Sequence, residues 1–324
     1  MNKVSNYFGI DISKDVFDVM DKNSVHYQFK NNESGFRSFS KLLSKDSYCV
    51  MEATGYYHYQ LASYLLNCNF LVSVANPLSV KRFIQMRLSK IKTDRSDAKM
   101  ICLYAQKVEL KLWTGHSANQ LDCLQITRML SVYTKQSTAL KNKIHGEEVL
   151  GEPCLLVVKS IKRSLKNIIK EMKILEDKLN ELVKLDHQDL LSRIETIPGL
   201  GRKTATMLIV LTDGFSSFSK GSELCSYAGL TPVIRQSGSS VRGRSRISKI
   251  GNQKLRNLLF MCSFTACIHN KACREIYQRI VAKGKSKKLA LMAVCNKLLK
   301  QAFAIAKSGL IYEESYKSIN PVLK

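Results

Sequence analysis

Four acidic side chains lie at positions from which they could hold a divalent metal. Asp11 is near the end of an apolar stretch, and Glu52 ends a second apolar stretch directly before a glycine turn. Asp94 and Asp97 begin a predicted helix, and their spacing of three residues puts both on one helix face. Mg²⁺ or Mn²⁺ prefers such oxygen ligands, and two ions about 4 Å apart can assist phosphodiester cleavage. The four acids therefore predict metal-dependent chemistry on phosphodiesters.

Each acid also has a structural explanation when it is taken alone. Asp94 could cap its helix, and Asp97 could be a first-turn acid that the helix dipole favours. Asp11 could begin a turn. The order of all four acids (strand one, strand four, late helix) favours a joint role instead. Asp15 and Asp18 fall in the predicted hairpin after the first strand, so we set them aside.

The elements that must position these acids alternate between strands and helices over residues 1 to about 110. Apolar runs and alternating patterns predict strands at 7–12, 16–20, 25–29, 47–52 and 70–74, the last closed by Asn76-Pro77. Helical spacing predicts helices at 33–43 and at about 57–66. Three antiparallel strands, a helix, then strand-helix-strand-helix is the element order of an RNase H-like α/β sheet.

The rest of the chain is predominantly helical. Residues from about 121 to 194 show apolar three-and-four spacing between charged residues, which predicts two long helices separated at Gly151-Glu152-Pro153. An intramolecular hairpin and a dimerising coiled coil explain this pattern equally well. We divide the chain into an α/β domain at 1–112, a long-helix or coiled-coil segment at 113–192, and a mostly α-helical C-terminal domain at 193–324.

The overall charge indicates a polyanionic partner. The 324 residues include 51 Lys and Arg against 26 Asp and Glu, a formal net charge of +25. Because such a surface repels itself, nucleic acid is the first candidate partner, and a solvated basic protein is the alternative.

Two C-terminal segments are candidates for phosphate contact. The run from Ile197 to Ala205 resembles the turn of a helix-hairpin-helix element, in which glycines allow a tight turn and a helix N-terminus offers backbone N–H groups. A generic helix-turn-helix core element is the alternative. The segment 229–256 holds seven Arg or Lys residues in a Gly/Ser-rich frame, where a flexible solvated loop is the alternative. The predicted nucleic-acid-binding residues are Gly199, Gly201, Arg202, Lys203, Arg235, Arg242, Arg244, Arg246 and Lys249.

Membrane and disulfide-stabilised classes fit the sequence poorly. The longest apolar runs are far shorter than the ~20 residues that a membrane span needs, and the N-terminus has no signal-peptide core. Ten cysteines without a CxxC pair are typical of reduced thiols in a cytoplasm. The spacing of Cys262, Cys267, His269 and Cys273 matches no usual zinc pattern. We therefore expect a cytoplasmic protein that does not act at a membrane.

Three motifs carry a resemblance to a known family: Gly-Ile-Asp-Ile-Ser-Lys at 9–14, Glu-Ala-Thr-Gly at 52–55, and Lys-Thr-Asp-Arg-Ser-Asp-Ala at 92–98. Together they resemble the RuvC-like DEDD domain of bacterial insertion-sequence transposases related to Piv-type DNA invertases. The resemblance continues through Ile-Pro-Gly-Leu-Gly at 197–201, Ser-Tyr-Ala-Gly-Leu-Thr-Pro at 226–232 and Ser-Lys-Ile-Gly-Asn at 248–252. It thus covers nearly the whole chain.

The resemblance implies a mechanism that the residues alone leave open. It implies a nucleophilic serine in a Ser-Gly context, which maps onto Ser237 and forms a covalent phosphoserine link to DNA. Without it, Ser239 and Ser240 compete for that role, and Arg235 and Arg242 flank the segment. The resemblance further implies donor and target DNA as substrates and an active site shared between protomers of a homo-oligomer, from dimer to tetramer. In some members a structured guide RNA selects the DNA.

Two other functions remain as alternatives. A RuvC-like junction resolvase or nuclease would use metal-activated water without a serine intermediate, although it would not need the C-terminal domain. A non-catalytic nucleic-acid scaffold could retain the fold and the charge, although all four acids are present. An invertase that needs no RNA would keep the same catalytic residues.

Overall fold

The computed structural model describes residues 6–53, 55–88, 93–234, 236–237, 241–242 and 246–314, with backbone alone for the two short pieces between 236 and 242. The chain forms two compact units, Met1–His116 and Ser117–Lys324. The predicted division of the chain at residues 112 and 192 stays a prediction.

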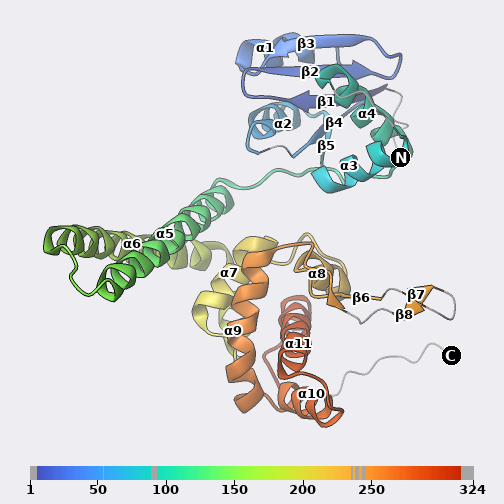
Figure 1. The fold of residues 1–324 in the computed structure, drawn as a ribbon. Coiled ribbons are helices and arrows are strands. Elements are labelled where there is room, and N and C mark those ends of the chain that lie inside the picture. The colour runs from blue at the N-terminus through green and yellow to red at the C-terminus, as the bar shows by residue number, and fades with distance from the viewer. Residues whose placement is uncertain are drawn as a thin grey trace, which may run out of the picture. The chain divides into compact units, whose positions relative to one another are not determined.

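The N-terminal unit is built on a mixed five-stranded sheet with the order β3-β2-β1-β4-β5 (Figure 1). The strands are β1 (Asn6–Ile12), β2 (Val16–Asp21), β3 (His26–Lys30), β4 (Ser47–Glu52) and β5 (Leu71–Ala75). The first three strands are antiparallel, and β4 and β5 run parallel to β1 and to each other. The predicted order of the strands is confirmed, with each strand within two residues of its expected bounds.

Helices cover both faces of this sheet. On one face, α1 (Glu33–Ser40) and α2 (His58–Asn67) close a core that includes Ile10, Phe17 and Phe39. On the other face, α3 (Pro77–Met86) and α4 (Asp94–Lys107) pack over Tyr48 and Val50.

Two helix predictions differ from the structure. The sequence predicted a helix at 33–43, but α1 ends at Ser40. The helix α3 was missed because Asn76-Pro77 was interpreted as the end of β5. The Asn76 side chain accepts a hydrogen bond from the Leu78 N–H at 2.8 Å, and Pro77 occupies the first helical position, so the same residues also start a helix.

Helix α4 approaches strand β1 so closely that no side chain fits between them. A Cβ atom on Gly9 would lie 2.1 Å from the Cys102 backbone nitrogen and 2.4 Å from the Ala98 carbonyl oxygen. Both distances are far below van der Waals contact, so only glycine allows this approach. Asp11 lies two residues along the same strand, on the same face, because side chains alternate along a strand.

The C-terminal unit is mostly helical, as the sequence predicted. Its first two helices, α5 (Ala118–Val149) and α6 (Leu155–Glu195), pack against each other as a hairpin (Figure 1). This confirms two helices and gives them an intramolecular contact. The distal part of the hairpin is thin, since no side chain in the described range 138–178 is buried. The core lies instead where the base of the hairpin meets the remaining helices.

Five further helices complete the core of this unit: α7 (Arg202–Thr212), α8 (Gly221–Tyr227), α9 (Gln253–His269), α10 (Lys271–Ala282) and α11 (Lys287–Ser308). By length and composition, α11 is the one described helix that could cross a membrane. Its buried side chains, including Val294, Leu298 and Leu299, belong to the core of this unit, as in the core helix of a soluble protein.

Gly9→Ala is expected to lower the free energy of unfolding by about 1–3 kcal/mol, because the new methyl group overlaps the α4 backbone, which must move. Gly146→Ala is the matched control. Gly146 lies in α5 with open space around it, so alanine there should stabilise by about 0.5–1 kcal/mol through helix propensity. Denaturant unfolding of both variants measures the difference, and equal stabilities would contradict the close approach of α4.

Candidate active site

The N-terminal unit brings all four predicted acids to one end of the sheet. Asp11 lies near the end of β1, and Glu52 is the last residue of β4, the parallel neighbour of β1. The carboxyl ends of parallel strands meet at the same sheet edge. Asp94 and Asp97 occupy the first turn of α4, the helix that crosses β1 at Gly9. The close approach at Gly9 thereby sets the position of the two helical acids.

The first turn of α4 is capped by residues other than the two acids. The Thr93 side chain accepts a hydrogen bond from the Ser96 backbone at 3.1 Å, and the Ser96 hydroxyl accepts one from the Thr93 backbone at 2.8 Å. This capping box satisfies the helix start. The suggestion that Asp94 is the N-cap is therefore wrong, and capping does not explain why an acid stands there.

The pKa of Asp11 reflects both its burial and the negative charges of the nearby acids. The pKa of its carboxyl is raised from 3.8 to about 6, first by burial and then by the negative charges of Asp97, Asp94, Glu52 and Asp18, in that order. Each neighbouring carboxylate disfavours a further negative charge on Asp11. All three other predicted acids thus contribute to the pKa of Asp11, although they come from different elements.

Sequence reasoning set Asp18 aside, but it lies within the same acidic group. It pairs directly with Asp11 across the β1–β2 hairpin, so the two side chains share a face of the sheet. Asp18 is 4% exposed and accepts hydrogen bonds from His26 Nε2 at 2.7 Å and Gln28 Nε2 at 3.3 Å. The two-residue turn at Lys14-Asp15 fixes this register, and the hairpin pattern in the sequence was the signal that could have shown it.

The chemistry of these carboxylates suits a divalent metal, although the side chains stand apart from one another. Within the described part of the chain, no three His, Cys, Asp or Glu side chains are close enough to hold one ion as they lie. Carboxylates without a cation repel one another, which favours separated side chains and a protonated Asp11. A bound Mg²⁺ would remove that repulsion and draw the oxygens inward. These carboxylates therefore suit a metal ion that draws its ligands together as it binds.

The predicted serine lies on a hairpin in the other unit. Strand β7 (Gln236–Ser237) pairs antiparallel with β8 (Val241–Arg242), and Ser237 stands opposite Val241. The hairpin extends away from the helices of its unit, where Figure 1 labels β7 and β8. Behind it, β6 (Pro232–Val233) pairs with β9 (Arg246–Ile247). The position of Ser237 is therefore set by two short strand pairs in series.

The base of this hairpin is a contact between two backbone segments at Gly229 and Gly251, both with positive φ. A Cβ on Gly251 would lie 2.2 Å from the Tyr227 carbonyl oxygen, and one on Gly229 would lie 2.8 Å from the Ile250 carbonyl oxygen. The Asn252 N–H donates to the Tyr227 carbonyl oxygen at 2.8 Å across this junction. We call this junction the glycine neck. It fixes where the chain leaves and re-enters the helical core.

The Pro-Gly turn has a structural role in addition to its predicted contact with phosphate. Gly199 has φ +102° and packs against α9, where its Cβ would lie 2.6 Å from the Ala266 Cβ. Gly201 is the N-cap of α7 and has open space around it. The turn therefore opens a helix, as predicted.

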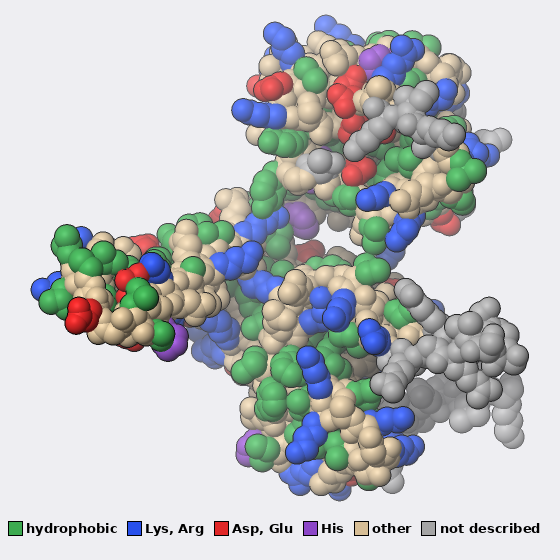
Figure 2. Space-filling view, in the orientation of Figure 1, with side chains coloured by type: hydrophobic (Ala, Val, Ile, Leu, Met, Phe, Trp, Pro, Cys, Tyr) green, Lys and Arg blue, Asp and Glu red, His purple; other side chains and the backbone are tan. Residues whose placement is uncertain are grey.

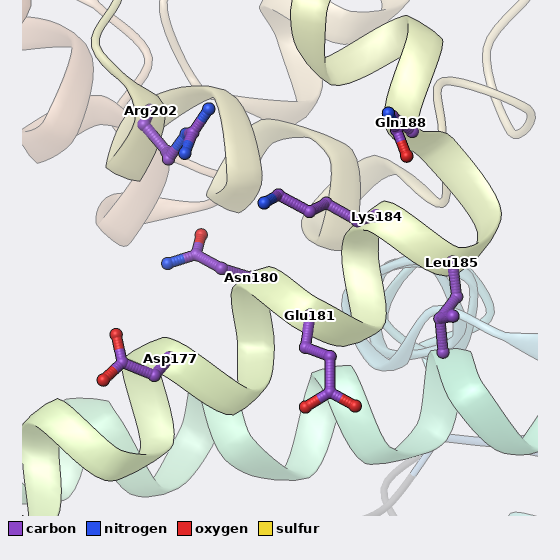
Figure 3. A pocket seen from close by; sticks show the side chains of 7 residues that line it. All are labelled: Asp177, Asn180, Glu181, Lys184, Leu185, Gln188 and Arg202. Atoms are coloured by element: carbon purple, nitrogen blue, oxygen red, sulfur yellow. The ribbon is translucent and has the colours of Figure 1, made fainter.

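The two cations at this turn are already paired with acids. Arg202 donates to both carboxylate oxygens of Glu195, at 2.7 and 3.2 Å, and Lys203 pairs with Glu176. Arg202 also faces a hollow of about 450 Å³ along α6, which Asp177 and Glu181 line as well (Figure 3). To bind a phosphate here, each cation would first have to leave its carboxylate.

The remaining predicted residues lie in the basic segment. Arg246 and Lys249 are exposed. For Ser237 and Arg242 the backbone alone is described, whereas Arg235, Ser239, Ser240 and Arg244 lie outside the described residues.

Comparison with known proteins identifies two family regions. A family model described as "Transposase IS116/IS110/IS902 family" matches residues 191–278, and an IS110-type DEDD model described as "Transposase" matches residues 8–150. Together they cover more than half of the chain, including all four acids and Ser237.

Several curated proteins are similar to this chain. The pilin gene-inverting protein of Moraxella bovis is 29% identical over 95% of this chain and 98% of its own length. The transposase of insertion sequence IS1111A from Coxiella burnetii is 24% identical over 89% of this chain and 86% of its own length. An uncharacterised IS110 protein of Streptomyces coelicolor is 32% identical over 49% of this chain and 38% of its own length.

The raised pKa of Asp11 predicts a pH-dependent response to Mg²⁺. Below about pH 6 the carboxyl holds a proton that a metal must displace, so the Mg²⁺-induced rise in Tm should be larger at pH 7.5 than at pH 5.5. Without metal, the proton on Asp11 stabilises the folded protein, and this contribution is lost as the pH rises from about 4 through about 6. Asp11→Asn should remove both effects, whereas Asp189→Asn, an exposed site on α6, should retain them. An equal Mg²⁺ response at both pH values in the unaltered protein would contradict this assignment.

Gly251→Ala is expected to distort the glycine neck and to lower Tm, because its methyl group would overlap the Tyr227 carbonyl oxygen. Gly284 has φ +68°, which alanine tolerates better than the φ +138° of Gly251, and it has open space around it, so Gly284→Ala reports the cost of a positive φ without any overlap. The neck variant should lose about 1–3 kcal/mol more than this control in denaturant unfolding. Equal losses would mean that the neck is not a close contact.

Proposed function

Because the chain belongs to the IS116/IS110/IS902 family of transposases, we propose that it cuts and rejoins DNA with metal-binding carboxylates and a nucleophilic serine. The observation that carries this proposal is the placement of Asp11, Glu52, Asp94 and Asp97 at one end of the sheet. Burial and the charges of the other three acids both raise the pKa of Asp11. Acids gathered in this way from two strands and a helix are costly for a stable fold and useful for binding a cation.

In this proposal, the N-terminal unit is an RNase H-like (RuvC-like) catalytic domain. Asp11, Glu52, Asp94 and Asp97 would hold Mg²⁺ or Mn²⁺, whose Lewis acidity would stabilise negative charge on the scissile phosphate. The sheet order, with three antiparallel strands followed by two parallel ones, supports the assignment. Asp18 accepts hydrogen bonds from His26 and Gln28, so its role is to hold the sheet edge beside Asp11.

The serine would form the covalent link to DNA. The Ser237 Oγ attacks the phosphorus, its proton is released, and a deoxyribose oxygen leaves with a proton. A phosphoserine ester stores the bond until a second deoxyribose hydroxyl displaces the serine. Arg235 and Arg242 are close in sequence and would stabilise the phosphate charge. A hairpin that extends from the helices of its unit on short strand pairs (Figure 1) suits a nucleophile that must reach into a bound duplex.

Rejoining is favoured over simple hydrolysis by the extent of the similarity. The pilin gene-inverting relative is matched along almost its full length, including the region of the serine hairpin. By its name that relative inverts a gene, a reaction in which the cut ends are joined again. A junction resolvase or nuclease would have no need for the second unit.

The partners of this enzyme follow from the same proposal. DNA serves as donor and target, and a structured guide RNA selects the sites, which would suit a protein with a formal charge of +25. Protomers associate, so that the acids of one and the serine of another form a composite site in the bacterial cytoplasm. The tip of the α5–α6 hairpin supports association, because Val149, Leu150, Leu155 and Leu156 are each at least 70% exposed.

The experiment that tests this function is excision in cells. The protein is expressed with its intact genomic flanks, and the circular junction of the element is amplified. Asp11→Ala and Ser237→Ala should each reduce the junction by about 10³-fold or more. Asp189→Ala and Ser192→Ala, at exposed α6 positions, should leave it unchanged. DNA binding should survive in Asp11→Ala, since acids add little to affinity for a polyanion.

Other outcomes would change the assignment in defined ways. Cleavage at the unaltered rate in Asp11→Ala would remove the metal-site assignment. A junction that persists in Ser237→Ala would favour water-mediated nuclease chemistry. A covalent protein–DNA adduct that survives in Ser237→Ala would move the nucleophile to Ser239 or Ser240.

A further inference from the structure

The long helix α6 has opposite charge in its two halves. Residues 155–173 contain six Lys or Arg and one acid, Glu171, whereas residues 176–195 contain six acids and three Lys or Arg. The acidic half lines the hollow in Figure 3 and pairs with the cations of α7. The basic half lies on the distal, thin part of the hairpin, and its cations have no role in the proposed function.

The six cations form one continuous stripe along the helix. At about 100° per residue, they fall within an arc of about 100° around the helix axis. Glu171 lies outside that arc, and the apolar side chains Met172 and Leu175, which reach the core of the unit, lie roughly opposite. We call these six residues the α6 stripe: Lys159, Lys162, Arg163, Lys166, Lys170 and Lys173.

The stripe is open to solvent along its whole length. All six side chains are exposed, and among the described residues none of them forms an ion pair. Figure 2 shows Lys and Arg side chains, in blue, on the surface of the α5–α6 hairpin. Six like charges on one helix face repel one another, so neither packing nor helix stability explains their arrangement. A polyanion would relieve that repulsion.

The spacing of the charges is comparable to the spacing of phosphates in a nucleic-acid duplex. From Lys159 to Lys173 the helix rises about 21 Å, so its six positive charges follow one another at an average of about 4.2 Å along the axis. Each strand of duplex DNA carries one phosphate per about 3.4 Å of axis. We propose that the α6 stripe is a docking surface for duplex DNA. It would contact the phosphate backbone along about six base pairs, independently of their sequence. The proposal rests on DNA being the substrate of this enzyme.

This surface adds a contact that the predicted nucleic-acid-binding residues do not provide. Arg202 and Lys203 are engaged by Glu195 and Glu176, whereas the stripe cations are ready to bind as they lie. Duplex DNA outside the cut site would bind to the distal part of the α5–α6 hairpin. The β7–β8 hairpin that carries Ser237 would then not need to supply the affinity for DNA.

The test compares variants of equal charge in full-length protein. The stripe variant replaces Lys159, Lys162, Lys166 and Lys170 by Gln, which has similar helix propensity to Lys. The control replaces Lys41, Lys45, Lys107 and Lys111 by Gln, all exposed positions in the N-terminal unit. Binding to a 30-base-pair DNA of arbitrary sequence is measured by fluorescence anisotropy from 50 to 300 mM KCl, beside an RNA hairpin of equal stem length.

The stripe variant should bind DNA at least about tenfold more weakly than the control at 100 mM KCl. The slope of log Kd against log salt should fall by about 3.6, close to 0.9 per lost phosphate contact. The same four Lys→Arg substitutions should restore both values, which shows that charge, and not helix disruption, is responsible.

Three results would overturn the proposal. Affinity and salt slope equal to those of the control would mean that DNA does not contact the stripe. A loss confined to the RNA hairpin would assign the stripe to RNA. Failure of the Lys→Arg variant to bind would point to helix disruption. Asp11→Asn separates this proposal from the proposed function, because it should abolish cleavage and leave the salt slope unchanged.

Discussion

The close contact between α4 and β1 is the constraint on which the candidate site depends. Gly9 has no side chain, so the Ala98 and Cys102 backbone can lie directly over the central strand. Two residues further along β1, Asp11 then comes under the first turn of the same helix. A larger residue at position 9 would separate the helical acids from the strand acids, even with all four carboxylates still present. The candidate catalytic residues and the packing residue are thus parts of one arrangement.

The sequence predicted this arrangement well where local patterns carry the information. Apolar runs and alternating patterns predicted all five strands, and the i, i+3 spacing of Asp94 and Asp97 placed both acids on one helix face. Asn76-Pro77 was ambiguous, because the same dipeptide can end a strand and begin a helix. The role of Thr93 as N-cap was within reach, since Thr93 and Ser96 have the spacing of a capping box.

Features that depend on distant partners were beyond local reasoning. Arg202 and Lys203 resemble phosphate-binding residues until the fold brings Glu195 and Glu176 beside them, and Glu176 is 27 residues away from Lys203. Similarly, the burial of Asp18 depends on His26 and Gln28 from the next strand. Charge composition alone thus overstates how many cations are ready to meet a nucleic acid, and long-range pairing decides which ones are.

The glycine neck is the place where the chain leaves the helical core and returns to it. Leu230 is still buried in that core, and the short strands beyond it pair with one another. A junction formed by backbone at Gly229 and Gly251 places few demands on the side chains between them. We therefore expect this segment to tolerate changes of length and sequence between relatives more readily than the helices that carry it.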